Sequence, residues 1–460
     1  MLFDGRKDDT KVMMEIEGSD KQYPAMIKEE HYSVCSEPGG KYLLHFVPEE
    51  PSDTDKRKAA EIIADNIVDW LKERQIEDHL LAIGGDSTNT NTGWGGGAMQ
   101  WIEKKLGRRL VWLVCDLHTG ELGLRHLIIK LDGPTLSHNK WSGPLGQMLD
   151  TATELEINPK FTKIIKGSPP IELEEKVISD LSTDQFYGYL IVKAIRSGVV
   201  PVRLPYLEIG PVSHARWLTT ALRFCRIWIS KHGLKGELLT TLRLIIEFIV
   251  GVYFPNWFNV KVKHKWVEGP NHVLYQLDLL RSQNKKVLDI VMPTIRRSAW
   301  YAHPEAVLQA MLCSDDMAER KEAVSKIVQI RGEGDEATQL GDTSVRPRRT
   351  PEINIKAVTL NQLVDLDDPL VTEPPLTCTL TTERIKKFID EPMEVPDWSS
   401  HTQSVERCVK MVTEAAGHVY THERREAYIR SKVTSRELMA LNNSKKDLCN
   451  LVKFRAVGSY

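Results

Sequence analysis

Two polar clusters follow apolar runs in the first quarter of the chain, and both have residue types that can bind a metal or a phosphate. The apolar residues 79–83 lead into the glycine-rich turn 84–93, which carries Asp86. A second apolar run, residues 110–114, is followed by Cys115 and His118. Because the tips of neighbouring strands meet at one edge of a sheet, we expect these two polar clusters to be neighbours.

Three carboxylates are candidates for a catalytic metal site. Asp4 ends what we interpret as the first strand, Asp86 ends the fourth, and Glu406 lies on a late helix. Carboxylates that converge within about 4 Å repel one another, so a functional cluster implies bound cations, here Mg²⁺ or Mn²⁺. The chemistry would be metal-dependent phosphodiester cleavage. The alternative is that the two aspartates only form turns, as strand-end aspartates often do.

Cys115 and His118 have the spacing of half a zinc site, with His126 further along the same helix. A second pair with metal-ligand spacing is missing, which favours a buried thiol and a histidine that caps the next helix.

Basic and aromatic residues begin a later helix at Arg216 and Trp217. They could contact a phosphate or stack on a base, and an amphipathic helix with a buried tryptophan explains them equally well. The basic residues 346–349 lie in a polar stretch and suit either a DNA backbone or a solvated linker. No GK[ST] or GxGxxG motif lies near Asn89, which argues against a nucleotide site there.

The order of elements predicts an α/β fold. We expect residues 1–4 to be the remnant of a first strand cut short by loss of earlier sequence, so that Met1 need not be the natural start. Residues 11–16 and 41–47 would then be the second and third strands. Helices at 56–75 and about 96–106 alternate with the strands that end at Asp86 and Cys115. This order matches the mixed sheet of an RNase H-like fold.

Beyond residue 132 the apolar spacing becomes mainly helical. We therefore divide the chain into an RNase H-like core at 1–131, a large mainly α-helical insertion at 132–395 with a flexible loop at 332–352, and C-terminal helices at 396–460 that complete the core. The predicted helices within the later regions are 184–196, 216–231, 235–252, 304–311, 317–331, 401–416 and 421–432.

Composition excludes several classes of protein. The 61 basic and 63 acidic residues leave a net charge of -2, so no overall basic field attracts nucleic acid. Seven scattered cysteines without CxxC pairs fit a reducing, intracellular compartment. The longest apolar stretch, 244–254, contains Glu247, and we expect no membrane span.

Taken together, these motifs resemble the transposases of the hAT superfamily. The matching features are the Asp86 turn, the Cys-x2-His at Cys115, the Arg-Trp at Arg216, and a Ser-x-x-Glu-Arg helix, which appears here one residue tighter at Ser404 to Arg407. The resemblance extends from residue 1 to about 440. The chain is also similar to uncharacterised invertebrate relatives of such transposases.

The resemblance implies a role for each matching residue. Asp4, Asp86 and Glu406 would hold the metal ions, and water and then a DNA 3′-hydroxyl would act as nucleophiles. Cys115, His118, Arg216 and Trp217 would shape the DNA-handling side of the site. DNA as partner, assembly into a homo-oligomer and a nuclear location are further expectations.

The chain also departs from the family. It has no BED-type zinc finger ahead of the core and no aromatic-rich assembly segment at its C-terminal end. The alternative function is therefore a domesticated or degenerate copy that binds DNA or protein without catalysis, and a third is an unrelated RNase H-like nuclease.

Overall fold

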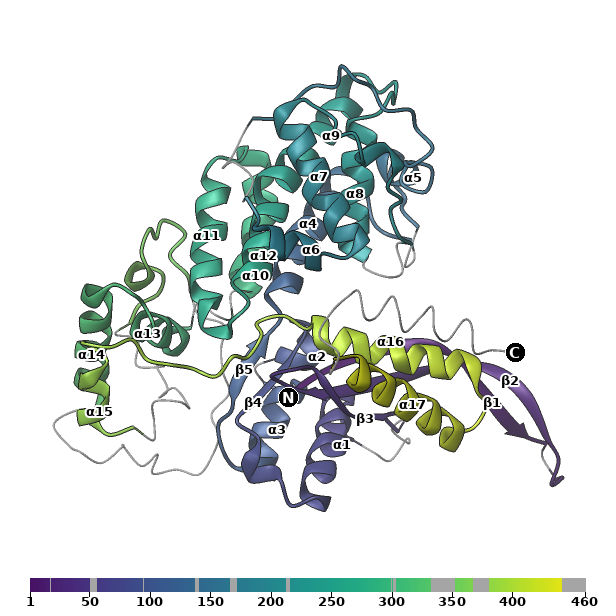
Figure 1. The fold of residues 1–460 in the computed structure, drawn as a ribbon, viewed down its shortest axis with the longest axis vertical. Coiled ribbons are helices and arrows are strands. Elements are labelled where there is room, and N and C mark those ends of the chain that lie inside the picture. Colours follow the sequence, from purple (N-terminus) through teal and green to yellow (C-terminus); the bar gives the residue numbers. More distant parts are fainter. Residues whose placement is uncertain are drawn as a thin grey trace. The chain divides into compact units, whose positions relative to one another are not determined.

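The computed structural model describes residues 1–16, 18–49, 56–93, 95–136, 140–165, 172–211, 216–298, 300, 303–331, 352–366 and 380–440. The chain forms two compact units (Figure 1). Met1–Trp112 and Thr402–Tyr460 make up the first unit, and Leu113–His401 make up the second. The predicted boundaries after residues 131 and 395 stay predictions.

A five-stranded mixed sheet has the strand order β3-β2-β1-β4-β5. β1 pairs with β2 and β2 with β3 in antiparallel fashion, whereas β1 and β4 are parallel. The prediction of an α/β fold is confirmed. The strands are β1 (Leu2–Glu15), β2 (Gln22–Ser36), β3 (Lys41–Phe46), β4 (Ala82–Gly85) and β5 (Val111–Val114).

The first unit contains six helical segments among its described residues: α1 (Ala59–Glu73), η1 (Glu77–His79), α2 (Asn89–Thr92), α3 (Ala98–Leu106), α16 (Gln403–His418) and α17 (His422–Ala440). α1 packs against α3. α16 packs along β1 and β2, and α17 packs on α16 (Figure 1). The last helices of the chain therefore cover its first strands.

The antiparallel part of the sheet differs from the prediction. Residues 11–16 are not a separate strand, because β1 runs without interruption for 14 residues and continues well beyond Asp4. β2 was not predicted at all. Both strands are rich in charged residues and lack the apolar alternation that marks a half-buried strand. Their pairing, from Leu2 opposite Cys35 to Glu15 opposite Gln22, forms one long hairpin.

One face of this hairpin is polar and yet buried. Side chains alternate across a strand, so Asp4 and Asp8 share a face of β1, opposite Ser33 and Glu29 of β2. Asp8 and Ser33 are buried, and Asp8 accepts a hydrogen bond from Thr413 of α16. This face therefore lies under α16. On the opposite face the rings of Tyr32 and Phe46 are stacked at 5.7 Å between centroids.

The described residues of the second unit are mainly helical. Its elements are α4 (Asp116–Asp132), α5 (Pro144–Gln147), α6 (Glu175–Asp180), α7 (Thr183–Ser197), η2 (Leu204–Tyr206), α8 (Arg216–Trp228), α9 (Gly236–Phe248), η3 (Ile249–Tyr253), α10 (Phe254–Val262), η4 (Trp266–Glu268), α11 (Gly269–Arg281), α12 (Lys285–Ser298), α13 (Pro304–Leu312), α14 (Met317–Arg331), η6 (Leu360–Gln362) and α15 (Thr382–Lys387). The basic residues 346–349 and all of the predicted loop 332–352 except Glu352 lie outside the described residues.

The helix predicted at 235–252 is longer than expected. It continues through the π-helical turn η3 into α10, whose first turn contains Pro255. Because proline lacks an N–H, the wider turn before it lets the helix pass without breaking. The segment Gly236–Val262 is long and apolar enough to cross a membrane, but 72% of its most apolar window is buried inside the protein, as in the core helix of a soluble protein. It is weak evidence for a membrane span.

Candidate functional site

Asp4 and Asp86 come together because β1 and β4 are parallel neighbours. Leu2 pairs with Gly84, and the Gly84 amide donates a 2.9 Å hydrogen bond to the Met1 carbonyl. Asp4 and Asp86 each follow this pair by two residues, so they lie at the same level on strands about 4.8 Å apart. Asp4 was predicted at the end of its strand and instead lies inside β1.

The turn after β4 orients the Asp86 carboxylate. Its Oδ1 accepts hydrogen bonds from the Thr88 amide at 3.1 Å, the Thr88 hydroxyl at 2.6 Å and the Asn91 Nδ2 at 2.6 Å. Gly85 allows this arrangement, since a Cβ there would lie 3.1 Å from the Phe3 carbonyl oxygen and 3.3 Å from Asn91 Nδ2. The prediction of a turn that presents Asp86 is confirmed.

Glu406 lies in the first turn of α16, where an acidic side chain is favourable to the helix dipole. The beginning of α16 is held against the sheet. The thiol of Cys35 in β2 lies 3.9 Å from the Ser404 hydroxyl, and a Cβ on Gly40 would come within 2.8 Å of the Ser404 Cβ. This close packing keeps Glu406 at the end of the sheet that carries Asp4.

The pKa of Asp4 is affected by both of the other carboxylates. Burial raises the pKa of Asp4 well above its usual range, and the negative charges of Asp86 and Glu406 raise it further. The Gly5 amide and the Arg6 guanidinium oppose this shift. The Glu406 residue as a whole is exposed. Loss of hydration caused by nearby protein atoms nevertheless raises the pKa of its carboxyl, and a hydrogen bond from Thr402 opposes this shift.

The donor set fits hard divalent cations, because every side chain in it offers carboxylate oxygens. Within the described residues these three side chains do not form a group whose ligand atoms all lie within 4.8 Å of one another. Asp4, Asp86 and Glu406 are therefore spread more widely than the ligands of a single ion. Two ions about 3.5–4 Å apart need such a wider set of ligands.

The residues predicted to handle DNA belong to the second unit, whereas the three carboxylates belong to the first. Cys115 is buried, and His118 Nδ1 lies 3.8 Å from Glu121 on the same helix. In the described part of the chain, neither residue belongs to a group of three metal-ligating side chains. Within the described residues, the zinc interpretation of Cys115 and His118 is therefore not supported by a close third ligating side chain.

Trp217 is buried and packs edge-on against Trp141, with 5.7 Å between ring centroids. Packing in the helical unit accounts for it, and its ring is not exposed for stacking on a base. Arg216 begins α8, and its side chain lies outside the described residues.

The sequence analysis did not single out Asp116, which stands between Cys115 and His118. Its Oδ2 lies 2.9 Å from Nδ1 of His272, and both residues are buried. Burial raises the pKa of Asp116, and His272 opposes the shift. The pattern around Cys115 drew attention to the thiol and the histidine, and nothing local indicated a partner on α11.

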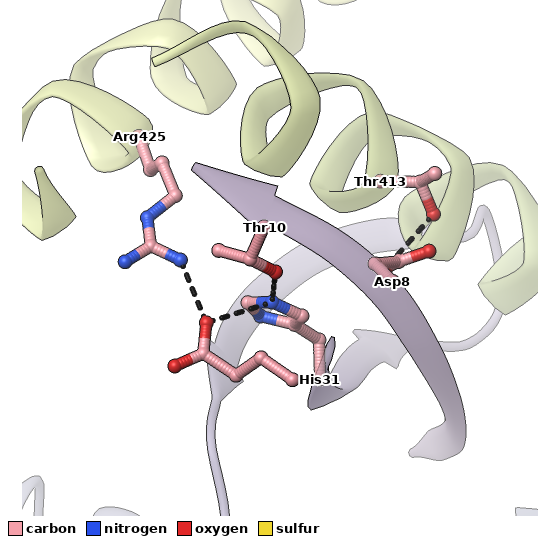
Figure 2. A network of polar contacts seen from close by, with 6 residues as sticks. Asp8, Thr10, His31, Thr413 and Arg425 are labelled. Atoms are coloured by element: carbon pink, nitrogen blue, oxygen red, sulfur yellow. Dashed lines mark hydrogen bonds and ion pairs between the residues drawn. The ribbon is translucent and has the colours of Figure 1, made fainter. Parts of the chain in front are cut away.

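A second polar network, also missed, joins the hairpin to the C-terminal helices (Figure 2). His31 Nε2 lies 2.9 Å from the Thr10 hydroxyl and 3.1 Å from Glu29 Oε2. Arg425 of α17 donates to the same Glu29 oxygen at 2.9 Å, and the Thr413 hydroxyl donates to Asp8 at 3.1 Å. Both contacts attach residues beyond 402 to the first two strands.

No protein-family model matches this sequence, and no curated protein or solved structure matches it significantly.

Proposed function

We propose that the first unit is a catalytic core of the hAT transposase type, which cleaves and transfers DNA strands with two divalent metal ions. The observation that carries this proposal is the position of Asp4 and Asp86 at the same level of adjacent parallel strands, with the charge of Glu406 acting on Asp4.

The sheet supports the same proposal. Three antiparallel strands followed by two further strands, in the order β3-β2-β1-β4-β5, is the arrangement we expect of an RNase H-like core. A mainly helical segment between β5 and α16 corresponds to the insertion that the resemblance implies. Many folds host several chemistries, so the carboxylates, and not the sheet, decide the activity.

Mg²⁺ or Mn²⁺ held by Asp4, Asp86 and Glu406 would supply an activated nucleophile and stabilise the leaving oxygen. The protein's own groups prepare the site. The Thr88 and Asn91 hydrogen bonds hold one oxygen of Asp86 still, and the Gly5 amide does the same for Asp4 Oδ1 at 2.9 Å. Carboxylates oriented in this way lose little freedom when they bind cations.

DNA is the proposed substrate, and assembly of the chain into a homo-oligomer and a nuclear location accompany this function. Since the net charge is -2, binding would depend on local basic surfaces and would weaken as salt rises.

The test is cleavage of nicked and hairpin DNA duplexes by the purified chain with Mg²⁺, with Mn²⁺ and with chelator. Asp86→Asn keeps the size of the side chain and removes its charge, and we expect it to lower the rate by a factor of about 1,000 or more. Asp9→Asn is the control, because Asp9 lies on β1, the strand that carries Asp4, in an exposed ion pair with Lys28.

Cleavage that needs a divalent cation, is lost in Asp86→Asn and is retained in Asp9→Asn supports the proposal. Cleavage that survives Asp86→Asn contradicts it. DNA binding without cleavage by the wild type would instead support the domesticated, non-catalytic alternative.

A further inference from the structure

Three metal-ligating side chains meet where the edge strand β3 faces α17. They are His45 of β3 and His422 and Glu426 of α17, and their ligand atoms all lie within 4.8 Å of one another. Among the described residues, no other group of three histidine, cysteine or acidic side chains has its ligand atoms this close together. All three belong to the first unit.

The local structure explains how the group forms. His422 and Glu426 are four residues apart on a helix, so they lie on the same face one turn apart. His45 pairs with Ser33 of β2, which in turn pairs with Asp4, so the imidazole lies on the polar face that α16 covers. One turn of α17 thus places an imidazole and a carboxylate next to the imidazole of His45 on β3.

The distances suit direct coordination. His45 Nδ1 lies 3.1 Å from Glu426 Oε1, and the rings of His45 and His422 are stacked with 5.7 Å between centroids. Ligand atoms about 2.0–2.2 Å from a tetrahedral zinc ion are a little over 3 Å from one another. His45 and Glu426 therefore already have the separation that a shared ion requires.

We propose that His45, His422 and Glu426 bind one Zn²⁺ ion that links α17 to the edge strand β3. Two imidazole nitrogens and one carboxylate oxygen are a ligand set that favours zinc over Mg²⁺, which prefers oxygen ligands alone. The site is thus chemically distinct from the all-carboxylate set of Asp4, Asp86 and Glu406.

The surroundings support the assignment. His45 is buried whereas His422 is exposed, so an ion can enter from the solvent side. The Tyr42 hydroxyl lies 2.8 Å from the same His45 nitrogen and would give up this hydrogen bond when an ion binds there. Arg430 lies 3.8 Å from the Glu426 carboxylate, and Arg425 is paired with Glu29.

The ion would strengthen an exposed part of the sheet. β3 is an edge strand, and edges need to be covered. An ion bound by residues that are far apart in the sequence stabilises the folded state by its binding free energy.

The test uses the full chain, freed of metal with chelator and titrated with Zn²⁺ in a calorimeter. We expect one ion per chain at this site and a rise in melting temperature on its addition. His422→Ala and Glu426→Gln should each weaken binding by about tenfold or more. Because His422 is exposed, its replacement leaves the core packed, and circular dichroism would check that the variant folds.

Glu423→Gln is the matched control, since Glu423 is an exposed carboxylate next to His422 on the same helix. Asp86→Asn separates this site from the proposed catalytic one. Zinc binding retained in both and lost in His422→Ala supports the proposal, as does the visible absorption of a tetrahedral Co²⁺ complex in place of zinc. Zinc affinity that is unchanged in His422→Ala and Glu426→Gln, or that is lost in Asp86→Asn, would overturn it.

Discussion

Asp4 of β1 and Asp86, directly after β4, lie side by side because each follows the paired residues Leu2 and Gly84 by two positions. The two carboxylates repel each other, and together with burial and Glu406 this repulsion raises the pKa of Asp4. A fold that gathers charges of one sign sacrifices stability at that point, as active sites commonly do. This cost is measurable.

We expect Asp4→Asn to stabilise the metal-free protein. The raised pKa means that the ionised form of Asp4 is penalised in the folded state, so removal of its charge helps most above that pKa and not at all in acid. The expected rise in melting temperature at neutral pH in chelator is roughly 2–4 °C, the shift that about 1 kcal/mol gives a domain of this size. Mg²⁺ should reverse the order, because the wild type binds it more tightly. Equal stability of the two proteins in chelator and in Mg²⁺ would contradict this.

The ring of Tyr32 packs directly over the backbone of its cross-strand partner Gly5. A Cβ at Gly5 would lie 2.6 Å from two ring atoms, so Gly5→Ala must push the ring away from its stacking position on Phe46. We expect a loss of about 1–3 kcal/mol in the free energy of unfolding, measured with urea. Gly417→Ala is the control. Its Cβ would meet nothing within 4 Å in α16, and the change should be neutral or stabilising.

The ion pair of Glu29 and Arg425 should make stability depend on acid pH. The hydrogen bond from His31, followed by that from Arg425, lowers the pKa of Glu29 to about 2 from its ordinary value of 4.5, against the effect of burial. Between these two pH values the unfolded chain binds more protons than the folded one, so this contribution is complete above about pH 4.5 and is lost as the pH falls toward about 2. Its size is on the order of 1–3 kcal/mol, because solvent screens a carboxylate that is only partly buried.

The measurement is the urea midpoint of the wild type and of Glu29→Gln, in chelator, from neutral to acid pH. The two curves should differ most at neutral pH and converge in acid. A constant difference across that range would show that the pair does not titrate as proposed.

In the second unit, His272 should matter because it is a buried hydrogen-bond partner of the buried Asp116 carboxyl. His272→Phe fills a similar volume but leaves Asp116 without this partner, and we expect a loss of about 3–5 kcal/mol. Adding Asp116→Leu to the same chain should recover part of the loss, since the buried charge is then gone. A double variant less stable than His272→Phe would mean that Asp116 stabilises the unit through other contacts.

Local patterns in the sequence were enough for some of the elements. The glycine-rich turn at Asp86 lies where it was expected, and the helix that carries Glu406 was predicted at 401–416 and found at Gln403–His418. Apolar periodicity and turn residues depend on near neighbours along the chain, which is why they can be read without a fold. The hairpin of β1 and β2 could not be predicted in this way, because its charged face is buried by helices from a distant part of the sequence.

The sequence by itself determined the residue types available for chemistry, the strand at Asp86 and most of the helices. Only the tertiary structure decided which of them meet. The level shared by Asp4 and Asp86 comes from the parallel pairing of β1 with β4, and the pairs of Glu29 with Arg425, Asp116 with His272 and His45 with Glu426 each join distant segments. Such contacts depend on strand register and helix packing across the whole chain, and no local pattern encodes them.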